Sequence, residues 1–105
     1  MFFKILSPGI VTLEDANNFR AFKVVVAPPD ADLDTVRRAL ANIALLPDRG
    51  TAWVSERALR AWPELANDSA WQEALTAMIA KARPHGWIDD ANKTIKAHVE
   101  WTVEP

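Results

Sequence analysis

The chain has 105 residues and a net charge of −2, and a chain of this length suits one domain that buries about 65% of the surface its unfolded form exposes. It has no cysteine, which excludes a disulfide framework, a thiolate zinc site and a cysteine nucleophile and favours a cytoplasmic location. Its 12 basic residues are scattered among 14 acidic ones, so no basic stripe is available for phosphates and we expect no nucleic-acid partner.

The first quarter of the sequence predicts a β-meander of three strands. Residues 2–6, 10–13 and 19–26 are rich in β-branched and aromatic side chains and are separated by segments of turn-forming composition. The third run is apolar on both sides, as a central strand usually is, and the proline pair that follows it ends strand pairing. The first run contains Lys4 and is too short for a signal peptide or a spanning helix, so we expect no membrane association.

The next segment predicts a long helix, a short strand and a short helix. Apolar residues recur at three- and four-residue spacing over residues 33–44, behind an acidic lead that suits a helix N-terminus, and a turn at 47–50 closes this helix. Residues 51–54 predict a short strand. Ser55 then caps a short helix that ends before Pro63.

A third helix follows a turn at residues 67–68. Ser69 and Gln72 have the spacing of a capping box, and the helix ends before Pro84. Its apolar side chains recur at helical spacing and predict a stripe that packs on the core. The stripe consists of Trp71, Leu75, Met78, Ile79 and Ala82.

Residues 94–103 predict a final strand with one dry and one wet face. The dry face carries only apolar side chains, and the wet face carries polar ones that include His98 and Glu100. Such a strand normally belongs to an antiparallel sheet covered on one side only. The whole chain, residues 1–105, is therefore predicted to be a single α+β domain: a largely antiparallel sheet of about four to five strands with about three helices packed on one face.

His98 and Glu100 are the candidate catalytic residues. In a partly enclosed site, His98 would transfer protons while Glu100 would orient the imidazole and stabilise its protonated form. This arrangement would suit a small cofactor-free enzyme of the isomerase, lyase or cyclase type that acts on an apolar or aromatic substrate. Alternating polar residues are also what the solvated face of an antiparallel sheet ordinarily shows, and that interpretation needs fewer assumptions.

Trp87, Trp53, Phe22 and His85 are the candidate ligand-binding residues. Trp87 lies at the mouth of a loop, where an indole can line a pocket or a partner surface. Trp53 has a similar position at the start of a short element, and Phe22 is a candidate wall of the same cavity. His85 ends a helix, where the helix dipole favours a protonated imidazole.

The sequence predicts neither a metal ion nor a cofactor. His85, Asp89, His98 and Glu100 could supply nitrogen and oxygen ligands, but their spacing matches no known metal motif. The sequence also lacks the glycine-rich motifs that cradle phosphates and the nucleophile elbow of α/β hydrolases.

Two functions of different classes stay open. The first is a non-catalytic binding or assembly domain that forms a symmetric homodimer, or that binds a protein partner or a small apolar molecule. Dimerisation is expected because the first or the last strand would be a sheet edge, whose unpaired backbone groups invite a partner strand. The second is the cofactor-free enzyme. The face of the sheet that the helices cover separates the two functions, since only a covered His98 side would enclose the catalytic pair.

Overall fold

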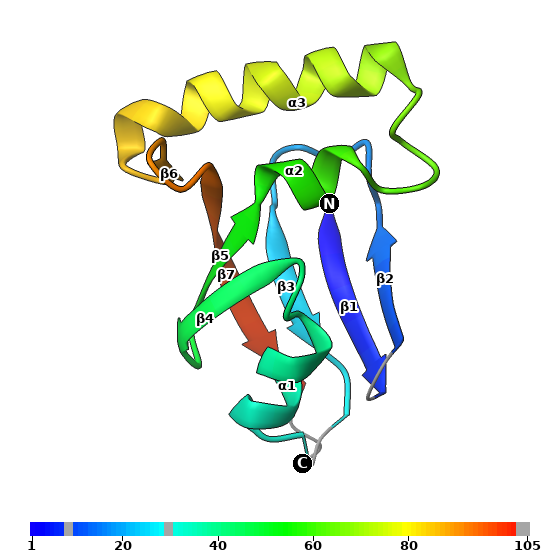
Figure 1. Ribbon diagram of the computed structural model, residues 1–105, viewed down its shortest axis with the longest axis vertical. Coiled ribbons are helices and arrows are strands. Elements are labelled where there is room, and N and C mark those ends of the chain that lie inside the picture. Colours follow the sequence, from blue (N-terminus) through cyan, green and yellow to red (C-terminus); the bar gives the residue numbers. More distant parts are fainter. Residues whose placement is uncertain (8–9, 29–30, 103–105) are drawn as a thin grey trace.

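The structure, a computed structural model, describes residues 1–7, 10–28 and 31–102 (Figure 1). Its elements follow one another in the order β1 (Phe2–Ser7), β2 (Ile10–Glu14), β3 (Lys23–Val26), α1 (Leu33–Ala39), β4 (Ala44–Asp48), β5 (Thr51–Ser55), α2 (Glu56–Arg60), α3 (Ser69–Ala82), the 3-10 helix η1 (Arg83–His85), β6 (Ile88–Asp89) and β7 (Thr94–Trp101).

All the strands belong to one mixed sheet. The sheet has seven strands in the order β2-β1-β3-β7-β5-β4, and the short β6 pairs with β7. β1 and β3 are parallel, as are β3 and β7, and the other pairs are antiparallel. The prediction of a largely antiparallel sheet of four to five strands is therefore wrong, although the fold is α+β overall.

The mixed pairing arises because β3 does not extend the β1–β2 hairpin. β2 ends opposite the start of β1, where Glu14 pairs with Phe2. The chain then crosses the end of β1 in a loop, residues 15–22, and enters β3 at Lys23, which pairs with Phe2 from the other side. The predicted third strand, residues 19–26, is accordingly shortened to four residues. Its first part belongs to the crossing loop.

The helix predicted over residues 33–44 begins as predicted, but its predicted length is wrong. Asp32 caps α1 by accepting a hydrogen bond from the Thr35 amide (2.8 Å), but the helix ends at Ala39. The chain resumes as β4, which forms a hairpin with β5. Within β4 the burial alternates, since Leu46 is buried and Leu45 is exposed. So short an apolar run fits the helical and the strand period equally well, which explains the error.

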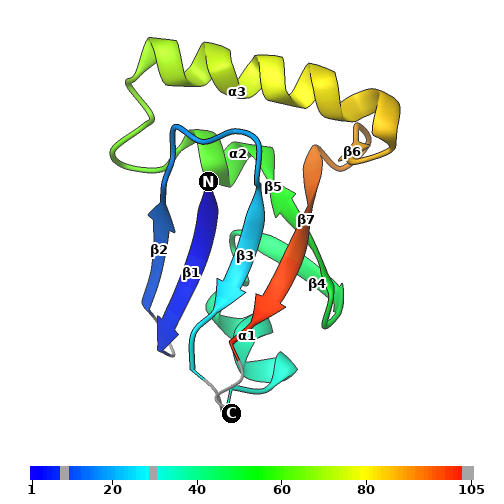
Figure 2. The ribbon, with the colours of Figure 1, turned by 180° about the vertical axis from the view of Figure 1, so that it is seen from behind.

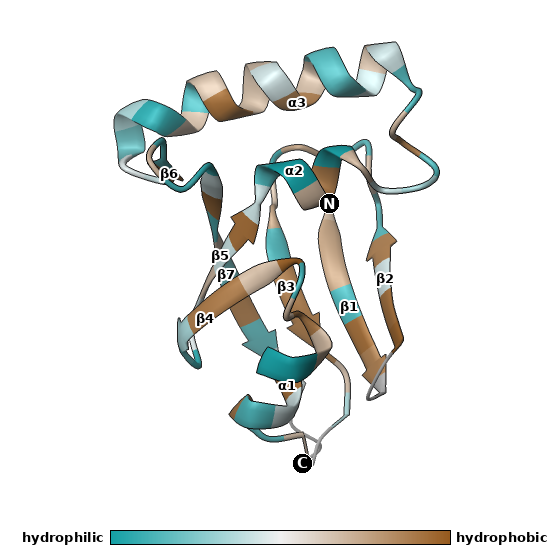
Figure 3. Cartoon of the chain, in the orientation of Figure 1, coloured by the Kyte–Doolittle hydropathy of each residue, from teal (hydrophilic) through white to brown (hydrophobic). Residues whose placement is uncertain are grey.

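One face of the sheet carries the hydrophobic core. Phe3, Val24 and Val54 from the strands share one buried cluster with Val36 of α1 and Leu59 of α2. β1 is mostly hydrophobic with one hydrophilic band, whereas β7 carries hydrophilic bands in keeping with its alternating exposure (Figure 3). Figure 2 shows the other face, where β2, β1, β3 and β7 lie in front of α1 and β4. That face has no helix over it among the described residues.

α3 lies across one end of the sheet and not over its face (Figure 1 and Figure 2). Trp71, Leu75 and Ile79 point into the core and anchor the helix there. The predicted arrangement, with the helices packed on one face, therefore holds for α1 and α2 but not for α3. This position makes α3 the roof of the space at the end of the sheet.

The predicted N-cap of α2 is confirmed, whereas that of α3 is wrong. Ser55 caps α2 by accepting a hydrogen bond from the Ala58 amide (3.1 Å), which confirms that prediction. In α3 the cap is Asp68, whose side chain accepts from the Trp71 amide (3.0 Å), and not Ser69. Gln72, the other half of the predicted capping box, donates instead to the carbonyl oxygens of Arg60 and Leu65.

Leu75 tests the attachment of α3 to the core. Its side chain is fully buried. We expect Leu75→Ala to lower the free energy of unfolding by about 2–4 kcal/mol, because a buried large-to-small change loses transfer free energy and leaves a cavity. Chemical denaturation measures the effect. An unchanged midpoint would show that this face of α3 does not pack on the core.

The start of α3 gives a paired test. Asp68→Ala removes the side chain that caps the helix and should lower the free energy of unfolding by about 1 kcal/mol. Ser69→Ala, one residue further on, is the matched control and should change it by less than about 0.5 kcal/mol, since Ser69 is exposed and is not the cap. Chemical denaturation measures both variants. A larger loss of stability in Ser69→Ala than in Asp68→Ala would show that Ser69 caps the helix, as the sequence predicted.

Candidate functional site

The final strand alternates as predicted. Ile95, Ala97 and Val99 are buried, and His98 and Glu100 are exposed on the opposite face. Val103, the last residue of the predicted strand, lies outside the described residues. Because α1 and α2 pack on the buried face, the face that carries His98 is the open one.

Glu100 makes its ion pair with a neighbouring strand. Its carboxylate lies 3.2 Å from the ammonium of Lys23 in β3. Lys23 is in turn the cross-strand partner of His98. The sheet therefore places a cation of the neighbouring strand beside the two predicted catalytic residues, and this cation engages Glu100. His98 lies at the margin of a groove that extends from this face to α3.

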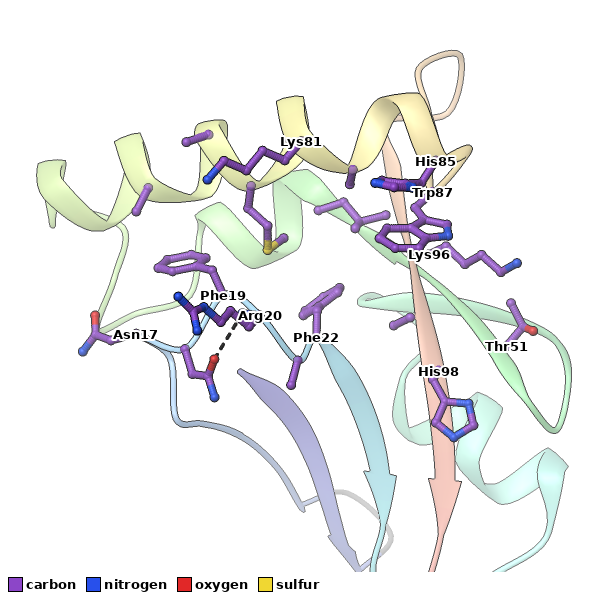
Figure 4. Close-up of a pocket in the computed structure, with 18 of the residues that line it drawn as sticks. Asn17, Phe19, Arg20, Phe22, Thr51, Lys81, His85, Trp87, Lys96 and His98 are labelled. Atoms are coloured by element: carbon purple, nitrogen blue, oxygen red, sulfur yellow. Dashed lines mark hydrogen bonds between the residues drawn. The ribbon is translucent and has the colours of Figure 1, made fainter.

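The groove, with a volume of about 1080 Å³, opens beneath α3 (Figure 4). α3 forms its roof, the crossing loop forms one wall, and η1 with the segment before β6 forms the other. β7 forms its floor. The residues that line it are Asn17, Asn18, Phe19, Arg20, Ala21, Phe22, Gly50, Thr51, Ala74, Ala77, Met78, Lys81, Ala82, His85, Trp87, Ile95, Lys96, Ala97 and His98.

The sheet topology creates this space. β5 pairs with β7 along residues 94–98, so β3 and β6 must share the other side of β7. β3 pairs only with residues 98–101, and β6 only with residues 94 and 95. Between them no strand lies beside β7 in the described part of the chain. The crossing loop and Trp87 stand on either side of this interval.

One face of α3 packs on the core, and a neighbouring face lines the groove. The residues that anchor the helix are buried in the core. A neighbouring face carries Ala74, Ala77, Met78 and Lys81, which recur at three- and four-residue spacing and line the groove. Two of these four residues are alanines, whose small side chains leave the space beneath the helix open.

Aromatic side chains form both walls. The indole of Trp87 is 46% exposed and stacks on the imidazole of His85, with ring centroids 4.5 Å apart. On the other wall, Phe19 contacts Trp71 at 6.0 Å between centroids. Trp71 also donates its indole N–H to the carbonyl oxygen of Ala16 (2.8 Å). This bond ties the crossing loop to α3 and fixes the width of the groove.

The segment that carries Trp87 is held by several polar contacts. The carbonyl oxygen of Trp87 accepts a hydrogen bond from the Lys96 amide of β7 (2.8 Å). Arg83 binds Asp90 at 2.9 Å across the following turn, and hydrogen bonds from Arg83 lower the pKa of the Asp90 carboxyl. Asp89 accepts from the amides of the same turn, and hydrogen bonds from Asn92 lower its pKa. Trp87 is thus positioned by the backbone before any ligand binds.

The groove is positively charged. Arg20, Lys81 and Lys96 line it, and no carboxylate is among the described residues that do so. None of these three takes part in an ion pair within residues 1–7, 10–28 and 31–102. The charge is local, because the whole chain has a net charge of −2.

The structure brings together three of the four predicted ligand-binding residues. Phe22, His85 and Trp87 all line the groove. Trp53 does not, and lines a separate cavity of about 600 Å³ with Leu45. The sequence analysis missed the contribution of α3, since Met78 looks like one more core residue, and that of the crossing loop, which looks like part of a strand.

Comparison of the chain with models of known families, with curated protein sequences and with solved structures finds no match. In the described part of the chain, no helix is long and apolar enough to cross a membrane. The same residues contain no cluster of three or more potential metal ligands. Inference about function therefore starts from the groove.

Proposed function

We propose that this protein is a non-catalytic binding domain whose groove beneath α3 holds a small apolar or amphipathic molecule. The convergence of Phe22, His85, Trp87 and Met78 on one groove supports this role. Ligand sites are typically concave, lined by apolar and aromatic side chains, and supplied with a few polar groups. The groove, at about 1080 Å³, is as large as the upper end of that class, so a ligand of ordinary size fills part of it.

The surroundings of His98 favour binding over catalysis. A general base needs a partner that orients it and a setting that excludes water. His98 is exposed on the open face, and Glu100 is paired with Lys23 at 3.2 Å. The cofactor-free enzyme is therefore the weaker proposal: His98 lines the groove but is exposed, α1 and α2 pack on the opposite face of the sheet, and Glu100 is engaged by Lys23.

An open groove of this kind supports modest affinity. A ligand that buries about 200 Å² of apolar surface gains about 5 kcal/mol at about 25 cal/mol per Å², before the entropy cost of association. A gain of about 5 kcal/mol alone would correspond to a dissociation constant of about 0.2 mM, and the entropy cost of association weakens binding further. For a simple aromatic probe we therefore expect a dissociation constant in the millimolar range. Ligand-observed NMR is suited to this range.

Filling the groove tests the proposal. Ala77 lines the groove, whereas Ala80 does not, and both are exposed residues of α3. We expect Ala77→Phe to weaken binding of the neutral probe 2-naphthamide at least about tenfold, because the new ring occupies the space beneath the helix. Ala80→Phe is the matched control and should bind like the unaltered protein. Saturation-transfer NMR measures both. Equal binding by the two variants, or no binding by the unaltered protein, would contradict the proposal.

Self-association is the second candidate function, but through a different edge strand from the one predicted. β1 and β7 each have neighbours on both sides, so neither is a sheet edge and that reason for a dimer is wrong. In the described sheet the edges are β2 and β4. Both edge strands have an irregular register with their inner neighbour, but β4 also contains Pro47, which discourages pairing. β2 has no proline, and Ile10 at its start is 51% exposed. This edge favours an antiparallel contact between two copies of β2.

Sedimentation equilibrium over a wide concentration range tests the dimer. We expect a dimer whose dissociation constant rises at least about tenfold in Ile10→Lys, because an added charge on an edge strand opposes pairing. Leu45→Lys places the same charge on the other edge, at an exposed residue of β4, and should leave association unchanged. A monomeric mass at high micromolar concentration would exclude this candidate.

A further inference from the structure

We propose that the groove selects anions, and that its ligand is a flat aromatic carboxylate with the carboxylate between Arg20 and Lys81 and the ring toward Trp87. This inference rests on the proposed binding function and adds the chemical class and the orientation of the ligand. Three features carry it: the charge of the lining, the places of its cations, and the polarity of α3.

The charge of the lining departs from that of the chain. Acidic residues make up 14 of the 105 residues, so a set of 19 would on average contain about two or three of them. The 19 residues that line the groove contain none, and they include three permanent cations without an ion-pair partner in the described part of the chain. A neutral ligand would leave these cations uncompensated around a partly apolar space, whereas an anion pairs with them.

The cations are not spread evenly over the groove. Lys81 reaches from α3 and Arg20 from the crossing loop toward the end marked by Phe19 (Figure 4). Lys96 points away from that end, beyond Trp87 (Figure 4). A guanidinium presents two parallel N–H donors that match the two oxygens of a carboxylate, and an ammonium adds a point charge. The Phe19 end therefore suits a carboxylate.

The other end suits an aromatic ring. α3 ends at Ala82, and η1, which contains His85, follows it and leads to Trp87. The C-terminal end of a helix carries partial negative charge, which disfavours an anion there. The exposed indole of Trp87 supplies a flat apolar surface for stacking instead. The same polarity argues against a phosphate dianion, which binds best at helix N-termini.

Two probes of the same shape separate charge from fit. 2-Naphthoate and 2-naphthamide differ in the charge of one substituent on the same ring. We expect the unaltered protein to bind 2-naphthoate about five- to thirtyfold more tightly than 2-naphthamide, because two exposed cations each add a modest interaction. The preference should shrink at high salt. Calorimetry or NMR titration gives both dissociation constants.

Variants identify the cations responsible. In the double variant Arg20→Gln with Lys81→Gln, the preference for 2-naphthoate should fall to less than about twofold. The preference is the ratio of two dissociation constants measured on one variant, so a general change in the groove affects both constants and cancels in the ratio. Arg57→Gln removes an exposed cation of α2 that does not line the groove, and should keep the full preference.

The outcomes are distinct. If both probes bind equally to the unaltered protein, the groove binds ligands but does not select anions, and this inference is overturned while the proposed function stands. If Arg57→Gln reduces the preference as much as the double variant does, the effect comes from overall charge and the inference is also overturned. If neither probe binds, the proposed function itself fails.

Discussion

The parallel placement of β3 between β1 and β7 is the constraint on which the rest of the structure depends. To enter β3 in this direction, the chain must cross the end of β1, and the crossing loop of residues 15–22 stands at that end of the sheet as a result. β3 also begins too late to reach the first residues of β7. The same arrangement therefore builds one wall of the groove and exposes its floor. A simple meander would have neither.

α3 contributes both to the stability of the fold and to the groove, because one of its faces packs on the core and a neighbouring face lines the groove. Trp71 links the core to the crossing loop: it is buried in the core, its ring contacts Phe19, and its indole N–H donates to the carbonyl oxygen of Ala16. The core contacts fix the height of the helix above β7, so the groove keeps its width without a ligand. Larger residues at Ala74 or Ala77 would fill that space and add packing contacts. A preformed binding site generally lacks the stability that such contacts would provide.

Local sequence patterns predicted part of the local structure, but they did not predict which strands pair in the sheet. The alternation of β7 and the cap at Ser55 depend on residues close in sequence, and both predictions are confirmed. The parallel pairing of β3 depends on a strand that lies more than 70 residues away along the chain. The same limit applies to the site: the spacing of His98 and Glu100 places them on one face, but Lys23, which engages Glu100, comes from another strand. Alanines that open a groove carry no signal in a sequence.

The most direct test of the account uses the two methionines of the chain. Met78 lines the groove, so its methyl group reports ligand binding there. Met1 is fully buried in the core and does not line the groove, so its methyl group is the internal control. With ¹³C-labelled methionine methyl groups, addition of 2-naphthoate should shift the Met78 resonance and give nuclear Overhauser effects between that methyl and the naphthyl protons. The Met1 resonance should stay in place. An unshifted Met78 methyl at saturating probe, or equal shifts of both methyls, would contradict a ligand site beneath α3.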